Sequence, residues 1–226
     1  MIRDPELGLS AGARRRVGAI AGIVGPAAFI GSWMLGGVLA GADYSPVEDP
    51  ISRLAAVDAE TRTLMTTGLV VFGLAMPLYA VALRSVAARG AAIAAAGTGL
   101  ATLAVAALPL DRSPAIDRWH GVAAGIGYLA LAVTPLFAAG PLRRRGWRRL
   151  ANAGVVAGVS TLVALGLTVS PLPTGLMQRL GLTVTDVWIV ATAVSMLGAT
   201  GQVRRDAQRP YGSESASASR SPRPTT

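Results

Sequence analysis

The chain has 226 residues, of which 52% are hydrophobic and only 15% are charged, and this composition excludes an ordinary soluble domain. It contains no cysteine, which excludes disulfides, thiolate metal ligands and thiol catalysis. The mean hydropathy of +0.50 instead indicates a membrane protein.

Six apolar blocks each have close to the roughly 20 residues that a helix needs to cross the hydrocarbon core of a bilayer. The sequence therefore predicts an all-α, polytopic membrane bundle of six transmembrane helices, at about 17–40, 63–83, 91–110, 119–139, 150–170 and 184–201. We expect 17–202 to form this domain, after a cytoplasmic segment at 1–16. The Ser- and Pro-rich residues 203–226 are expected to form a disordered cytoplasmic tail.

The first apolar block has a second interpretation, as a cleaved signal peptide. It follows three arginines and ends at Ala40-Gly41-Ala42, which resembles a small-residue cleavage site. Its uncharged run, 17–39, is longer than the roughly 7–15 apolar residues of a signal peptide, which favours a spanning helix. Cleavage would leave the other five spans in the same orientation.

The distribution of arginine predicts the orientation, because basic residues in short loops are retained on the cytoplasmic side. Five arginines lie at one set of span ends and twelve at the other, the larger group being 14–16, 84, 89, 143–145, 148, 149, 204 and 205. We therefore expect both termini in the cytoplasm and the acidic loops outside, as in a bacterial plasma membrane. Because these arginines lie beside the spans, the net charge of +9 favours membrane lipids over nucleic acid as the partner.

Small residues four apart within the spans predict close helix packing, since they let two backbones approach. Packing inside the bundle is the first interpretation, and a homo-oligomer or a membrane-protein partner is the alternative. The glycine pairs of this kind are Gly18 and Gly22, Gly121 and Gly125, and Gly154 and Gly158. Three tryptophans near span ends, Trp119, Trp147 and Trp188, are expected to anchor the chain in the membrane interface.

The first outer loop, 43–56, contains a predicted helix start at Asp49-Pro50, with the carboxylate as cap and proline at the first helical position. Ile51, Leu54 and Ala55 would share one face of a short amphipathic helix. This segment is either a cap without chemistry or part of a site.

The second outer loop leads to the single histidine of the chain, His120, in the first turn of the fourth span. Asp117 precedes it by three residues, so the two would share a helix face and the carboxylate would favour the imidazolium. Such a histidine can act as acid, base or pH sensor, or it can bond across the mouth of the bundle.

The third outer region, 171–180, is read as a loop in which Arg179 pairs with an outer carboxylate or a headgroup phosphate. Asp186 follows near the top of the last span and is the deepest acid. An acid at that depth is expected to point into the bundle or into a wet cavity.

Several motifs in this order resemble domain-of-unknown-function family 998, a bacterial family of six-helix membrane proteins. They are Tyr44-Ser45-Pro46 with 49–54, Pro109-Leu110-Asp111 with Trp119-His120-Gly121, and Gly175-Leu176 with Gln178-Arg179 and Trp188. The resemblance covers about 17–202 and implies a fold and a membrane location rather than an activity. The motif positions that it singles out are Ser52, Asp111, His120 and Arg179.

Three functions are compatible with these residues. The first is a small protein that binds lipid, senses a condition or packs against a partner through its outer polar site. The second is a membrane hydrolase or transferase acting on a lipid or small amphiphile, and the third is a transporter of a neutral solute, because the spans lack central charges. Catalytic candidates are Asp111, His120 and Ser52, and binding candidates are Asp49, Arg179, Asp186 and Asp117. We expect no cofactor and no metal, since one histidine without cysteine gives few zinc ligands.

Overall fold

A computed structural model describes residues 10–207, and their side chains up to residue 199. Over that range the chain is helical, with α1 (Ala11–Leu39), α2 (Arg62–Leu83), α3 (Arg89–Ala107), α4 (Pro114–Arg144), α5 (Arg148–Leu167) and α6 (Thr174–Ala207). A short 3-10 helix, η1 (Ile51–Ala55), lies between α1 and α2. The six long helices are long and apolar enough to cross a membrane, which confirms the predicted all-α bundle of six spans.

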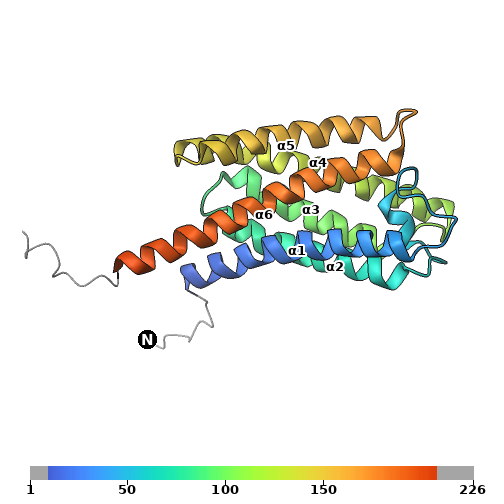
Figure 1. The fold of residues 1–226 in the computed structure, drawn as a ribbon, viewed down its shortest axis with the longest axis horizontal. Coiled ribbons are helices and arrows are strands. Elements are labelled where there is room, and N and C mark those ends of the chain that lie inside the picture. The colour runs from blue at the N-terminus through green and yellow to red at the C-terminus, as the bar shows by residue number, and fades with distance from the viewer. Residues whose placement is uncertain (1–9, 208–226) are drawn as a thin grey trace, which may run out of the picture.

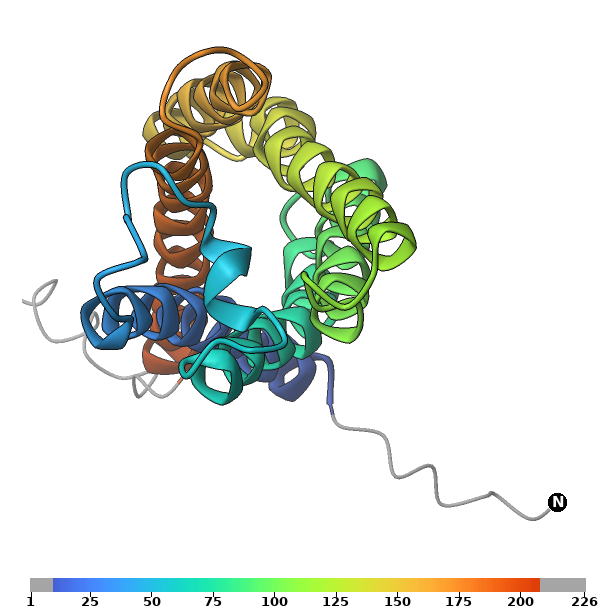
Figure 2. The ribbon, with the colours of Figure 1, turned by 90° about the vertical axis from the view of Figure 1, so that its right-hand side faces the viewer.

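The long helices run alongside one another (Figure 1), and together they form a ring that follows the chain order (Figure 2). Each helix packs against the next one, and α6 closes the ring against α1. Seen along the bundle, η1 lies at one end, inside the ring of helices (Figure 2). We call this the η1 end; the loops 40–61, 108–113 and 168–173 lie there, and the loops 84–88 and 145–147 lie at the opposite end.

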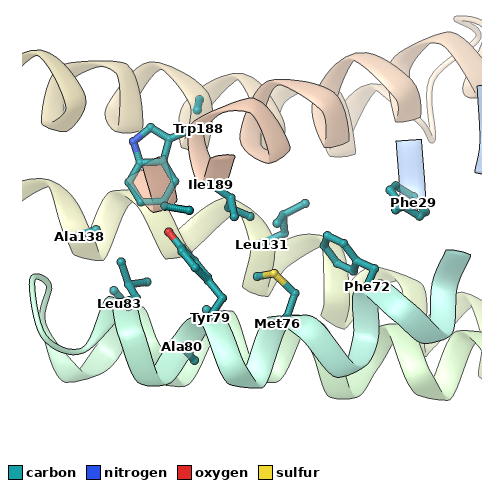
Figure 3. Packing of buried hydrophobic residues seen from close by; sticks show 14 of the residues in the cluster. Phe29, Phe72, Met76, Tyr79, Ala80, Leu83, Leu131, Ala138, Trp188 and Ile189 are labelled. Atoms are coloured by element: carbon teal, nitrogen blue, oxygen red, sulfur yellow. The ribbon is translucent and has the colours of Figure 1, made fainter. Parts of the chain in front are cut away.

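Large apolar side chains fill the middle of the ring. Tyr79 and Met76 of α2 face Leu131 of α4 and Ile189 of α6, and each of the four is at most 2% exposed (Figure 3). Apolar side chains also cover the outside of the bundle, where Leu100 is 63% exposed. An apolar exterior around an apolar core is what a lipid environment requires.

Two of the three predicted glycine pairs lie at helix contacts. A Cβ atom on Gly158 of α5 would lie 2.6 Å from the carbonyl oxygen of Ala132 on α4, so only glycine permits this approach. Gly22 is similarly covered by Tyr79. In contrast, no atom lies within 4 Å of a Cβ placed on Gly121 or Gly125, so this pair is at no contact in the monomer.

Two helices, α1 and α4, begin before the apolar blocks that predicted them, because local caps extend them. Ser10 accepts a hydrogen bond from the backbone of Ala13 and starts α1 ahead of the arginines at 14–16. Ser113 caps α4 in the same way, with Pro114 at the first helical position.

The start of α6 corrects the reading of 171–180 as a loop. The helix begins at Thr174, and its first free N–H groups donate to the first loop: Gly175 to the carbonyl of Glu48 at 3.1 Å, and Leu176 to that of Val47 at 2.8 Å. These acceptors are distant in sequence, which is why local patterns did not reveal the helix start. At its other end α6 continues to Ala207, into the predicted tail, and 208–226, like 1–9, lie outside the described residues.

Of the tryptophans read as interface anchors, Trp119 is 63% exposed at the start of α4 and Trp147 is half-buried. The expectation for Trp188 is wrong. Its side chain is only 2% exposed, and its indole N–H donates to the carbonyl of Leu150 at 2.9 Å (Figure 3). Because α6 begins earlier than expected, Trp188 lies in the interior of that helix rather than near its end.

Candidate functional site

A cavity lies inside the ring beside η1, with about 640 Å³ of atom-free space that includes the part open to the outside. Its wall is mostly apolar and includes Phe29 of α1 and Phe72 of α2, whose ring centroids are 5.4 Å apart. The polar side chains that line it are Ser52, Thr98, Thr102, His120, Tyr128, Gln178 and Asp186. An apolar wall with a few polar groups is the usual composition of a pocket for a small molecule.

Asp186 lies on α6, two turns after Gln178, and its side chain is 1% exposed. Among the described residues, neither of its carboxyl oxygens has a hydrogen-bond partner. Its predicted orientation into the bundle agrees with its place in the cavity wall. A buried carboxyl group without a partner is rare in proteins, because its lost hydration is not replaced.

His120 is 5% exposed, and its Nδ1 atom lies 2.6 Å from the carbonyl oxygen of Leu108 at the end of α3. A carbonyl can only accept, so Nδ1 carries the proton of this bond. The second ring nitrogen, Nε2, then has a free lone pair when the ring is neutral. The carboxylate of Asp117, predicted to share a helix face with His120, accepts from the backbone N–H of Asp111 at 3.0 Å, and among the described residues no hydrogen bond or salt bridge joins it to His120.

Gln178 connects η1 to α6 at the rim of the cavity. Its side-chain oxygen accepts from the backbone N–H of Ile51 at 2.6 Å, which leaves the amide NH₂ group for other partners. The backbone carbonyl of Gln178 accepts from the hydroxyl of Tyr128 on α4 at 2.9 Å. The rim is therefore held in place by three separate elements.

Arg179 lies outside the cavity wall, next to the loop that precedes η1. The side chain is buried, and its Nη1 donates to the carbonyls of Asp49 and Gly175 at 2.9 and 3.0 Å. Nη2 donates to the hydroxyl of Tyr44, and the guanidinium carbon lies 5.4 Å from the ring centroid of Trp33. The partners of the guanidinium are thus carbonyl, hydroxyl and aromatic groups and not the expected carboxylate, and its buried Nε has no partner among the described residues.

The Tyr44 phenol that receives this bond is itself half-buried. Burial raises the pKa of Tyr44, and the positive charge of Arg179 opposes this effect without cancelling it. The phenol therefore stays neutral at ordinary pH. Together, Arg179 and Tyr44 fasten the first loop to the start of α6.

The remaining candidates lie near the cavity but not in its wall. Asp111 forms a salt bridge of 3.2 Å with Arg53, and both side chains are nearly half exposed. Asp49 does not cap η1 as predicted; its carboxylate accepts from the backbone N–H of Ser45 at 2.8 Å. Of the predicted site residues, the cavity thus unites Ser52, His120 and Asp186, while Asp49, Asp111, Asp117 and Arg179 lie at the η1 end outside its wall.

Comparison with protein families identifies the chain. The sequence model of the family described as "Protein of unknown function (DUF998)" matches residues 23–195. The chain belongs to the DUF998 family. No match was found among curated proteins or among solved structures. The matched region of this DUF998 protein includes every residue that lines the cavity.

Sequence reasoning missed four polar groups of the cavity in this DUF998 protein: Thr98, Thr102, Tyr128 and Gln178. A signal was present, because each shares a helix face with another lining residue. Tyr128 follows His120 by two turns of α4, and Gln178 precedes Asp186 by two turns of α6. Within residues 10–207 no group of three histidine, aspartate or glutamate side chains is placed to hold a metal ion.

Proposed function

We propose that this DUF998 protein binds a small amphiphile or a single lipid chain in the cavity beside η1. The observation that carries this proposal is the buried, unpartnered carboxyl group of Asp186 in an otherwise apolar wall. An unsatisfied buried polar group costs about 1–3 kcal/mol, and a bound ligand with a polar head would supply the missing partner. The apolar remainder of such a ligand would contact Phe29, Phe72 and their neighbours.

We place the η1 end on the extracytoplasmic side of a bacterial plasma membrane. This orientation is supported by the arginines, since 84, 89, 143–145, 148 and 149 lie at or next to the opposite end of the bundle. The cavity would then open toward the outer leaflet, where lipids and amphiphiles from outside the cell are available as ligands.

A variant that fills the cavity tests the proposal. Ala124 of α4 lines the cavity, so Ala124→Leu would occupy its volume, whereas Ala191→Leu adds the same atoms at an exposed position of α6. Each protein would be purified in lipid nanodiscs, and the molecules that remain bound would be identified by native mass spectrometry. We expect wild type and Ala191→Leu to retain a bound molecule that Ala124→Leu loses. Equal retention by all three proteins would refute binding in the cavity.

A hydrolase or transferase acting on the same amphiphile is the second candidate. It is favoured by one observation, that Ser52 and His120 line the same cavity and could serve as nucleophile and base. A fluorophosphonate probe, which labels activated serines, tests it. Labelling that Ser52→Ala and His120→Gln both abolish would support the enzyme, and an unlabelled wild type would leave binding as the function.

A further inference from the structure

We infer that the ligand of the cavity carries a positively charged head that donates hydrogen bonds, such as a protonated amine, and not an anionic head. This inference rests on the proposed function and specifies its ligand class. It follows from counting which polar atoms in the wall still have a proton to give and which have only lone pairs.

The hydroxyl protons of the wall are largely occupied by backbone carbonyls. Thr98 donates to the carbonyl of Ala94 at 3.1 Å, and Thr102 donates to that of Thr98 at 2.9 Å. Tyr128 donates to the carbonyl of Gln178 at 2.9 Å. A hydroxyl group has a single proton, so all three present only acceptor lone pairs to a ligand.

The histidine adds another acceptor. Because Nδ1–H of His120 is directed at the carbonyl of Leu108, the neutral ring offers Nε2 to the cavity as a lone pair. Asp186 adds two carboxyl oxygens that have no partner among the described residues, and both accept when the group is ionised beside a cation. Five side chains therefore converge on the cavity with acceptor atoms.

Donors and positive charges are scarce in the same wall. Apart from the proton that the Asp186 carboxyl group carries when it is neutral, the available donors are the hydroxyl of Ser52 and the amide NH₂ of Gln178, both at the η1 side. No arginine lines the cavity, and Arg179 is engaged by two carbonyls and the Tyr44 hydroxyl outside it. A phosphate or carboxylate head would thus meet the Asp186 carboxyl group without a compensating cation.

An ammonium head satisfies these groups at once. It has several N–H donors for the acceptor atoms, and its charge is opposite to that of the Asp186 carboxylate. The two donors near η1, Ser52 and Gln178, could donate to a hydroxyl group of the ligand that lies next to the amine.

Three ligands of similar shape and different charge test this inference: phenethylamine, phenethyl alcohol and phenylacetate. Their dissociation constants would be measured by ligand-detected NMR with the full-length protein in phosphatidylcholine nanodiscs at neutral pH. Signals from empty nanodiscs and from the cavity-filled Ala124→Leu variant would be subtracted. We expect the amine to bind at least about tenfold more tightly than the alcohol, and phenylacetate to bind most weakly.

The Asp186→Asn variant assigns the preference to the carboxyl group. We expect it to bring the affinity for the amine to within about threefold of that for the alcohol, because the charge is removed with little change in shape. The order of the three ligands on the wild-type protein decides the inference even if this variant does not fold. Phenylacetate binding as tightly as the amine would overturn the inference while leaving the cavity as a binding site. Equal binding of all three to wild type and Ala124→Leu would instead overturn the proposed function.

Discussion

The Nδ1 atom of His120 and the carbonyl oxygen of Leu108 are 2.6 Å apart, and this bond joins the start of α4 to the residue that directly follows α3. It has two separate consequences. It satisfies a carbonyl that the end of α3 leaves without a helical partner, and it fixes which ring nitrogen faces the cavity. Stability and the proposed ligand binding would therefore depend on different atoms of one side chain.

Two substitutions of His120 should separate these roles. The amide nitrogen of asparagine is placed like Nδ1, so His120→Asn keeps the donor to Leu108 and loses the group at Nε2. Glutamine reaches the Nε2 position, so His120→Gln keeps a polar atom in the cavity and loses the bond to Leu108. We expect His120→Gln to lower the free energy of unfolding by about 1–3 kcal/mol, and His120→Asn to lower it less.

Unfolding in mixed micelles would measure the first effect, and titration with phenethylamine the second. Phenethylamine should bind His120→Asn more weakly than it binds wild type, although this variant should be more stable than His120→Gln. Parallel losses of stability and affinity in both variants would contradict the separation.

The hydrogen bonds of Arg179 predict that the shape of its guanidinium group matters as much as the positive charge. Arg179→Lys keeps a cation but loses the planar fork that reaches the carbonyls of Asp49 and Gly175 together with Tyr44. We expect a loss of about 2 kcal/mol or more in the free energy of unfolding. Tyr44→Phe, which removes one acceptor only, should cost about 1 kcal/mol. Chemical unfolding of both variants checks the order, and a lysine variant as stable as wild type would disprove it.

The span pattern could be predicted from sequence because hydrocarbon length and hydropathy are local properties of each block. Because successive spans alternate in direction, the sequence also predicted that His120, Asp186 and the first loop lie toward the same end of the bundle. The burial of Asp186 could also be predicted from the sequence, because an acidic side chain at that depth in a span avoids lipid by pointing into the bundle.

The details of the site could not be predicted, because they depend on contacts between distant segments. The carbonyls of Val47 and Glu48 start α6, and that early start places Arg179 on a helix and Trp188 in the core. Asp117 and His120 are close in sequence, yet each finds its partner elsewhere, in Asp111 and Leu108. Such choices between competing partners are not encoded in spacing alone.

Asp111 should tolerate some substitutions and not others because of its backbone. Its φ of 65° lies in the left-handed region, where asparagine and glycine are accepted and branched side chains are strained. Since its salt bridge with Arg53 is exposed, Asp111→Asn should cost less than about 1 kcal/mol, whereas Asp111→Val should cost about 1–2 kcal/mol more. Thermal unfolding compares the two, and neither should change amine binding, because Asp111 does not line the cavity.

Two glycine positions should respond to alanine with opposite signs. Gly158→Ala would press its Cβ against the carbonyl of Ala132 and against Leu136, so α4 and α5 must separate and stability should fall by about 1–3 kcal/mol. Gly125→Ala meets no atom within 4 Å and should gain up to about 1 kcal/mol from helix propensity. Unfolding curves measure both changes. If Gly125→Ala were destabilising instead, a partner seated on that face would be the first explanation to examine by cross-linking.

The absence of cysteine makes the proposed orientation directly testable, since a single introduced cysteine is the only thiol in the chain. Asp58→Cys places an exposed thiol at the η1 end, and Ser85→Cys places one in the α2–α3 loop at the other end. With intact cells and a maleimide that does not cross membranes, we expect Asp58→Cys to react and Ser85→Cys to react only after the cells are permeabilised. Neither change removes an arginine, so the charge pattern that sets the orientation is preserved. The reverse labelling pattern would place the cavity mouth in the cytoplasm, and its ligand would then have to be an intracellular amphiphile.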